Sequence, residues 1–279
     1  MSKGVSHLKK SLLYWLLLSP LLLVILFPYA VMLSTALKPR HEIFVFDPTW
    51  WPSELQWSNF VDMWDAVGFG TALKNSLLIS GSSVLICLLV AIPAGYATAR
   101  FSFRGQPAYR QFLLITQMLS PIVLIIGIFR MMAKLGIVDQ PIGLILAYAA
   151  FNMAFATWML QSYFATIPKD LEEAAWIDGA TWLQSLTRVF LPMALPSLAV
   201  TAILTFINTW NEFVLAFSLL RSQQSYTLTI QIYSLVGAAY KINWEHVMAA
   251  TLLATLPVAI VFAWLQRYLV KGLSIGGIK

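Results

Sequence analysis

The polar side chains of this chain are concentrated in two places, and neither has the composition of a catalytic centre. The first is the segment 170–192, which opens with Asp170, Glu172 and Glu173. The second is a series of Thr, Asn and Glu side chains between Thr201 and Glu212. Carboxylates, amides and hydroxyls of this kind can bind and dock other molecules, but covalent chemistry also needs a nucleophile beside an oriented base.

Other chemical motifs are missing from the sequence. His7, His41 and His246 do not have the spacing of metal ligands, and Cys87 is the only cysteine, so an internal disulfide is impossible. No Gly-x-x-x-x-Gly-Lys-Ser/Thr phosphate loop occurs, and the net charge of +6 is not arranged as a basic stripe with interleaved aromatic residues. We therefore expect no catalytic residue, metal site, cofactor or nucleic-acid partner in this chain.

The elements that position the polar segments are apolar helices. Hydrophobic residues make up 59% of the chain and charged residues only 11%, with a mean hydropathy of +0.75. A soluble domain carries about a quarter charged residues, so this composition indicates a lipid environment. The fold class expected is an all-α integral membrane protein with six transmembrane helices. The six apolar windows are 12–33, 76–97, 112–129, 142–163, 196–220 and 247–265.

The distribution of Lys and Arg residues predicts the orientation of these helices. Six spans place both termini on one side, and that side carries eleven of the 18 Lys and Arg residues. Positive charge favours the cytoplasm, so both termini and the loop at about 164–192 are predicted to be cytoplasmic, in the inner membrane of a prokaryote. The first window is longer than a signal peptide and is interpreted as a retained span. Ala91, Gly95 and Ala99 repeat at four-residue spacing, which favours close helix packing.

The segment 170–192 predicts a helix–turn–helix that projects from the membrane. Asp170 and Glu173 have the spacing of a capping box, so a first helix is expected from about 171 to 178. Gly179 can end it in the left-handed conformation, and a second helix is expected from 181 to about 188. The small residues Ala174, Ala175, Gly179 and Ala180 would form a face that another protein can approach. The alternative is an ordinary capped loop lying on the lipid headgroups.

The second polar region is a stripe on the fifth predicted span. Thr201, Thr205, Asn208, Asn211 and Glu212 are expected to share one helix face. An acidic residue inside a membrane is costly and is a candidate for function, so Asn208, Asn211 and Glu212 are predicted to line a substrate pathway. The alternative is a position of Glu212 near the outer interface, with Asn208 bonded to a neighbouring helix. Weaker pathway candidates with the same ambiguity are Gln117, Asn152 and Gln161.

The spacing in the cytoplasmic segment resembles that of a known family. The pattern Glu-Ala-Ala, three residues, Gly, nine residues, Ile, any residue, Leu-Pro is typical of permeases of binding-protein-dependent ABC importers. Here it falls on Glu173-Ala174-Ala175, Gly179 and Val189-Phe190-Leu191-Pro192, with Val in place of Ile as the only departure. The resemblance covers nearly the whole chain and is greatest to the sugar branch related to the second membrane subunit of the maltose transporter. That branch is also similar at Leu37-Lys38-Pro39, Asn75-Ser76, Trp210-Asn211-Glu212-Phe213 and 266–273, whereas Asn152 stands where many members have Pro.

The resemblance implies a type I ABC importer permease for a sugar or polyol. It implies as partners a second homologous permease, two ABC ATPase subunits that carry ATP and Mg, and an extracytoplasmic solute-binding protein. The expected divisions are 1–70 (N-terminus, first span and extracytoplasmic loop), 71–267 (permease core) and 268–279 (cytoplasmic tail). Two other functions stay open: an ion-coupled secondary transporter and a non-transporting membrane scaffold. The expected ATPase-coupling residues are Glu172, Glu173, Ala174, Ala175, Asp178, Gly179, Ala180, Leu191 and Pro192.

Overall fold

The computed structural model describes residues 2–47, 49–237 and 242–276, and side chains from 14 to 266 within those ranges. Regular structure in the described ranges is helical only. The chain divides into two compact units, Met1–Phe69 with Ile232–Thr255 and Gly70–Gln231 with Leu256–Lys279. The predicted boundary after residue 70 is thus close to one division of the chain. The predicted tail at 268–279 overlaps the end of the last helix, and 277–279 lie outside the described residues.

Four single helices are long and apolar enough to cross a membrane. They are α1 (Ser2–Ala36), α4 (Phe69–Arg100), α7 (Pro141–Phe164) and α14 (Trp244–Gly276). Two further candidates are bent pairs, so the described residues offer four spans, or up to six if each bent pair is one span. These four helices contain the first, second, fourth and sixth apolar windows of the sequence. The all-helical membrane fold that the sequence predicted is therefore confirmed.

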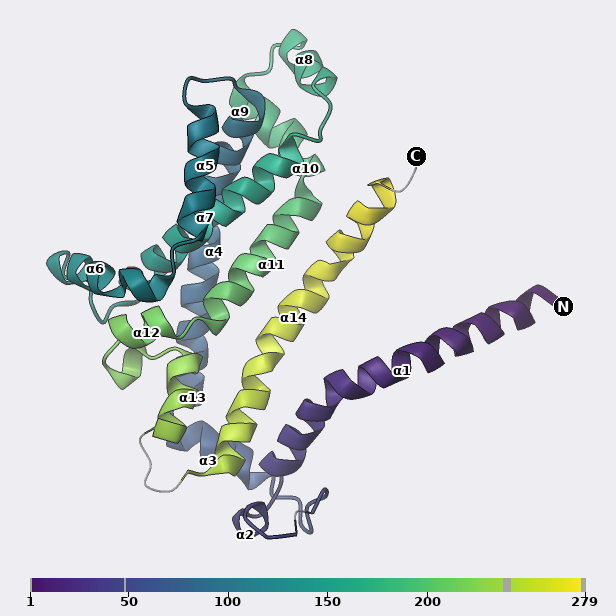
Figure 1. The fold of residues 1–279 in the computed structure, drawn as a ribbon, viewed down its shortest axis with the longest axis vertical. Coiled ribbons are helices and arrows are strands. Elements are labelled where there is room, and N and C mark those ends of the chain that lie inside the picture. The colour runs from purple at the N-terminus through teal and green to yellow at the C-terminus, as the bar shows by residue number, and fades with distance from the viewer. Residues whose placement is uncertain (1, 48, 238–241, 277–279) are drawn as a thin grey trace. The chain divides into compact units, whose positions relative to one another are not determined.

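The third predicted window, 112–129, is not a continuous helix. It is divided between α5 (Gln106–Gln117) and α6 (Pro121–Lys134), which meet at 98° (Figure 1). Ser120 between them has an extended backbone with ψ 133°, because a residue that precedes proline is disfavoured in the helical region. The third predicted window is therefore a bent pair of helices and not one continuous helix.

The fifth predicted window, 196–220, is also broken. Helix α11 (Leu195–Asn211) ends before Glu212, whose backbone is extended with ψ 127°. The chain continues as α12 (Val214–Leu219), η2 (Gln223–Ser225) and α13 (Leu228–Gly237). The Glu212 carboxylate accepts hydrogen bonds from the backbone N–H groups of Leu215 and Ala216, at 2.9 and 3.2 Å, and so caps the start of α12. Glu212 therefore does not lie on the same helix as Thr201 and Asn208.

The first unit contains α1, α2 (Arg40–Ile43), α3 (Ser58–Ala66) and the beginning of α14. The Asn59 side chain donates to the carbonyl oxygens of Ala36 and Lys38, at 2.8 and 3.0 Å, and fixes α3 to the end of α1. Arg40 and the buried Glu245 form an ion pair at 4.0 Å. Residues 14–31 of α1 are all exposed in the isolated chain, as expected for a surface that faces lipid or another subunit.

The second unit packs α4 closely against α7. A Cβ atom at Gly95 would lie 3.1 Å from the backbone nitrogen of Gln161 and 3.2 Å from Leu160 Cβ, so only glycine fits without a shift. Ala91 is fully buried nearby. The small residues at four-residue spacing therefore serve close packing, as the sequence predicted. At one end of this unit α8 (Asp170–Ile177) projects beyond the ends of α5 and α7 (Figure 1), and α9 (Trp182–Ser185) follows it.

Asp139 holds the loop before α7 to the loop after α12. Its carboxylate accepts from the backbone N–H groups of Arg221 and Ser222, at 2.8 and 3.1 Å, and its own N–H donates to the Leu219 carbonyl at 2.8 Å. Burial acts to raise the pKa of Asp139, but these N–H groups, with the hydroxyls of Ser222 and Ser225, hold the pKa below its usual value. Asp139 also has a positive φ of 61°.

Candidate functional site

The helix–turn–helix expected from the sequence is present, and we call residues 169–190 the knob. Its first helix, α8, ends in a Schellman motif. Gly179 has a φ of +81°, its N–H bonds to the Trp176 carbonyl at 3.0 Å, and the Ala180 N–H bonds to the Ala175 carbonyl at 2.9 Å. The predicted role of Gly179 as a left-handed helix terminator is confirmed.

The predicted capping box at Asp170 and Glu173 is wrong. The residue before the helix is Lys169, whose carbonyl accepts from Glu172 and Glu173 N–H at 2.9 and 3.0 Å, so Asp170 is already the first helical residue. A capping box occurs instead at α9. There the Thr181 N–H donates to Gln184 Oε1 at 2.8 Å, and the Gln184 N–H donates to the Thr181 hydroxyl at 3.3 Å.

The second arm of the knob is shorter and less regular than the sequence predicted. Helix α9 is only four residues long and passes into the π-helix η1 (Leu186–Phe190) and then α10 (Leu191–Met193). Pro192 lies in α10 and has no backbone N–H to donate to the preceding turn. The π-helix η1 lies directly before α10, where this donor is missing. Leu191 is half-buried and Pro192 is exposed, so this end of the motif joins the knob to α11.

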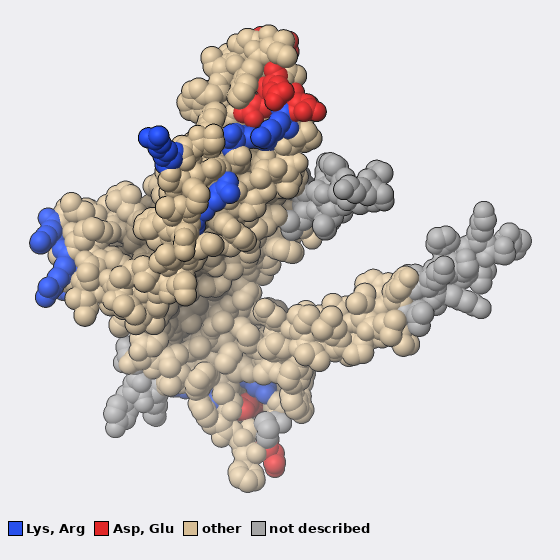
Figure 2. Space-filling view, turned by 45° about the horizontal axis from the view of Figure 1, so that its top comes forward, with Lys and Arg blue, Asp and Glu red and all other residues tan. Residues whose placement is uncertain are grey.

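The outer surface of the knob is apolar and acidic. Glu173, Ala174, Asp178 and Gly179 are exposed, while Ala175 and Ala180 are half-buried. Around them lie the large exposed side chains of Leu171, Trp176, Ile177, Trp182 and Leu183, of which Ile177 is 86% exposed. Figure 2 shows the acidic side chains gathered at this end of the unit. Such a concentration of exposed aromatic and aliphatic groups is typical of a surface that another protein covers.

Glu172 differs from the other residues of the motif because its side chain points inward. It is 5% exposed and pairs with Arg100 of α4, whose Nε lies 3.4 Å from Glu172 Oε2. Tyr96, one helical turn before Arg100, donates its hydroxyl to Glu172 Oε1. The sequence placed Glu172 among the docking residues, but in this structure it holds the knob to the bundle.

A polar pocket of about 220 Å³ lies in the second unit, beside the break between α5 and α6 and the end of α11 at Glu212. Four of the five predicted pathway residues line it, Asn208, Glu212, Gln117 and Asn152. The remaining lining residues are Thr116, Leu119, Pro121, Tyr148, Phe151, Thr209 and Leu215. Asn211 is exposed and does not line the pocket, and neither does Gln161.

Hydrogen bonds organise the pocket walls. Asn208 Nδ2 donates to Asn152 Oδ1 at 3.3 Å, and Asn152 Nδ2 donates to the Tyr148 carbonyl at 2.9 Å. The Tyr148 hydroxyl donates to Glu212 Oε2 at 2.8 Å. The sequence did not single out Tyr148, because a tyrosine within an apolar span has the pattern of a core residue. Its four-residue spacing from Asn152 was the available signal.

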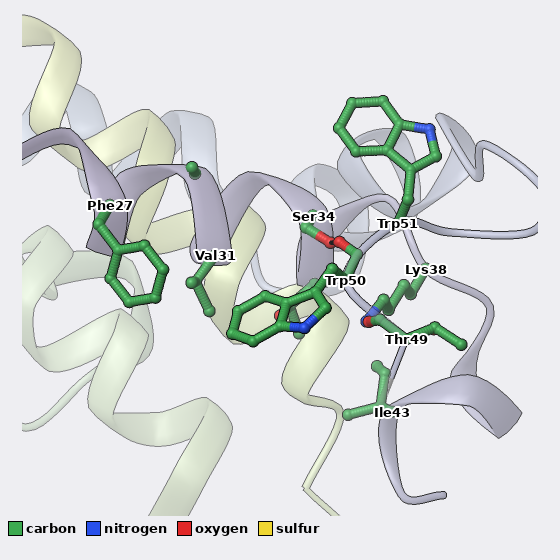
Figure 3. A pocket seen from close by; sticks show the side chains of 10 residues that line it. Phe27, Val31, Ser34, Lys38, Ile43, Thr49, Trp50 and Trp51 are labelled. Atoms are coloured by element: carbon green, nitrogen blue, oxygen red, sulfur yellow. Dashed lines mark hydrogen bonds between the residues drawn. The ribbon is translucent and has the colours of Figure 1, made fainter. Parts of the chain in front are cut away.

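A larger pocket, of about 350 Å³, lies in the first unit and includes none of the predicted residues. Phe27 and Val31 of α1 face the Trp50 ring across it, and the Lys38 ammonium donates to the Thr49 carbonyl (Figure 3). Among the described residues, no group of three or more His, Cys, Asp and Glu side chains could hold a metal ion.

The helical membrane fold, the projecting knob and the polar pocket beside broken helices are the features expected of a transport protein that spans the membrane. Residues 91–275 match the family of binding-protein-dependent transport system inner membrane components, and the chain belongs to this family. The chain is therefore a membrane-embedded permease of the ABC transporter type.

Relatives of known name extend over most of the chain. It is 33% identical over 260 residues to the inner membrane ABC transporter permease protein YcjP of Escherichia coli, covering 92% of each chain. It is 36% identical over 211 residues to the trehalose/maltose transport system permease protein MalG of Thermococcus litoralis, covering 76% of each. A crystal structure of a bacterial ABC transporter that imports the acidic polysaccharide alginate contains a similar chain. The two share a TM-score of 0.78 and 25% identity, over 94% of this chain and 97% of that one.

Proposed function

We propose that this permease moves a sugar or a related polyol into the cytoplasm, driven by ATP hydrolysis on partner subunits to which the knob docks. The named relatives support the substrate class, since one serves a trehalose/maltose system and another belongs to an alginate importer. The partners are a second homologous permease, two ABC ATPase subunits and an extracytoplasmic solute-binding protein. In this arrangement ATP and Mg bind to the ATPase subunits, and this chain is not itself catalytic. Both termini and the knob are cytoplasmic.

The observation that carries the docking proposal is the apolar surface of the knob. Trp176, Ile177, Trp182 and Leu183 are all at least about half exposed, yet the backbone beneath them is fixed by a Schellman motif and a capping box. A rigid, exposed apolar surface binds a partner with little loss of conformational freedom. Coupling then requires that the ATPase dimer binds the knob with different free energies in its open and closed states, because a partner indifferent to both states shifts neither.

The substrate route is proposed to pass through the pocket between the broken helices. In a membrane, non-helical backbone is tolerated only where it is buried in protein or lines a water-filled cavity. Two breaks of the second unit, at Met118–Ser120 and at Glu212, border the same pocket. The carboxamides of Gln117, Asn152 and Asn208 offer donors and acceptors that suit the hydroxyl groups of a sugar.

An ion-coupled secondary transporter is supported less well. Such a transporter needs ionisable groups along its path, and among the described residues that line the pocket Glu212 is the only charged one. Its carboxylate accepts hydrogen bonds from Leu215 N–H, Ala216 N–H and the Tyr148 hydroxyl. These bonds assign it to the chain break.

The test is the Ala174→Asp variant in a complex purified through this chain and reconstituted in liposomes. Ala174 is exposed on the knob, so an added charge there opposes the docking of a partner without disturbing the packing of this chain. Ala175 is half-buried, so a charge at that position would disturb the packing as well. We expect the variant subunit to insert normally but to lose binding-protein-stimulated ATP hydrolysis. The matched control is Ala108→Asp, an equally exposed alanine in the first turn of α5. Normal stimulation in Ala174→Asp, or uptake that survives ATP depletion but not an uncoupler, would contradict the proposal.

A further inference from the structure

A single buried arginine joins both arms of the knob to α4. Arg100 Nη2 donates to the Ile167 carbonyl at 2.6 Å, its Nε lies 3.4 Å from Glu172 Oε2, and its Cζ lies 4.6 Å from the centre of the Phe190 ring. Its side chain is 3% exposed. Ile167 precedes α8, Glu172 lies in α8 and Phe190 ends η1, so one guanidinium contacts the entry, the first helix and the exit of the knob.

Tyr96 completes this buried cluster, and we call Tyr96, Arg100 and Glu172 the latch. Tyr96 is 1% exposed, and its ring contacts Phe164 and Phe190 edge-on, with centroids 6.2 and 5.0 Å apart. Its hydroxyl donates to the same carboxylate that pairs with Arg100. The charged part of the latch is therefore enclosed by aromatic rings on the side of the bundle.

Stability alone does not explain a charged pair at this position. Removing two ions from water costs several kcal/mol per ion, and well-packed apolar residues of similar volume often stabilise a protein as well or better. Arg100 is oriented by the hydrogen bond from its Nη2 to the Ile167 carbonyl, whereas its Nε faces Glu172 without a hydrogen bond, so the pair adds a charge attraction that keeps the two side chains together. If α8 moved without α4, the charges of Arg100 and Glu172 would each be left buried and unpaired.

Near its other end, α4 is joined by hydrogen bonds to the chain segment 224–228, which follows α12. Asn75 Nδ2 donates to the Gln224 and Tyr226 carbonyls at 2.8 and 3.1 Å, and the Ser76 hydroxyl accepts from the Leu228 N–H at 2.8 Å. Asn75 and Arg100 are 25 residues apart on α4, so the two bonded sites are about 38 Å apart along a helix of 1.5 Å rise.

We propose that the latch is the positioning element that passes displacement of the knob to α4, and through α4 to the segment 224–228. The proposal rests on the proposed docking of the knob to an ATPase subunit and deepens it. Arg100, Glu172 and Tyr96 act through the helix that they hold, and none of them contacts the substrate.

The experiment is hydrogen exchange on the whole complex, with and without MgATP and vanadate to trap the closed ATPase dimer. The latch is removed in the double variant Arg100→Met, Glu172→Gln, because loss of one charge alone would leave the other buried and unpaired. The matched control is Asp170→Asn, which removes one charge from the same helix at an exposed position. In the wild type and the control, trapping is expected to change exchange both in the knob and in 224–228.

In the double variant the knob is expected to respond as in the wild type, while the change at 224–228 falls about tenfold, the scale of a typical coupling between sites. Sugar moved per ATP hydrolysed, measured with maltose and trehalose, falls with it. An unchanged response at 224–228 in the double variant would overturn the latch and leave the docking proposal intact. A wild-type knob that does not respond to trapping would overturn the docking proposal itself.

Discussion

Substitutions at Gly179 can distinguish an effect on docking from an effect on the stability of the knob. Its φ of +81° disfavours any side chain with a Cβ, yet a Cβ built there meets no atom within 4 Å. Within this chain, substitution thus costs backbone strain only, about 1–2 kcal/mol for alanine in the left-handed region. Asparagine tolerates that region far better, so Gly179→Asn adds bulk with little strain, whereas Gly179→Ala adds strain with little bulk.

If an ATPase subunit covers Gly179, bulk is the damaging change. We expect Gly179→Asn to retain the thermal stability of the purified complex and to lose stimulated ATP hydrolysis by about tenfold or more. Gly179→Ala should lower stability and retain most of the stimulation. The assay is ATP hydrolysis in proteoliposomes, with the midpoint of thermal unfolding measured on the same preparations. Full stimulation in Gly179→Asn together with its loss in Gly179→Ala would refute the reasoning, because strain and not contact would then be the cause.

Three other predictions concern the pocket, the helix packing and the loops. Asn208→Leu should raise the KM of sugar uptake severalfold because it removes an amide from the pocket, whereas Asn211→Leu, outside the pocket, should leave the KM unchanged. If neither variant changed uptake, the result would favour a membrane scaffold that does not transport. Gly95→Ala should destabilise the subunit by about 1–3 kcal/mol through overpacking, whereas Gly81→Ala on the same helix, with open space around it, should be neutral or stabilising in a thermal melt. The depressed pKa of Asp139 contributes stability that is complete above its ordinary pKa of 3.8 and is lost as pH falls through the lower folded value. Asp139→Asn, which tolerates the positive φ, should therefore flatten the loss of stability below about pH 4 in acid unfolding.

The spans could be predicted because hydropathy and length are local properties, but the breaks within them could not. Pro121 accompanies a right-angle turn, whereas Pro20, Pro93 and Pro257 lie inside continuous helices. Proline removes one hydrogen bond wherever it stands inside a helix, and neighbouring helices decide whether the chain then kinks or breaks. The break at Glu212 had still less signal, since it depends on a carboxylate that bonds forward to the next helix.

The knob was the most predictable part of the candidate site because the signal that ends α8 lies in adjacent residues. Gly179 ends α8 by its own conformational freedom. Glu172 could not be assigned correctly, because its inward position depends on Arg100 and Tyr96, which are far away in the sequence. The pocket was predicted through its amides, whereas Asn211 was placed in it by assuming a regular helix through Glu212. Tyr148 was missed because burial and function share the same apolar pattern.

The π-helix Leu186–Phe190 has a consequence for how the knob is aimed. Such a segment amounts to one residue inserted into a regular helix, and each residue of an α-helix turns the chain by about 100°. Deleting one residue between 186 and 190 would thus turn the short helix α9, with Trp182 and Leu183, by about that angle relative to α10. The direction in which Trp182 and Leu183 face therefore depends on the number of residues in this segment. A single-residue deletion there would keep both side chains but turn them in another direction.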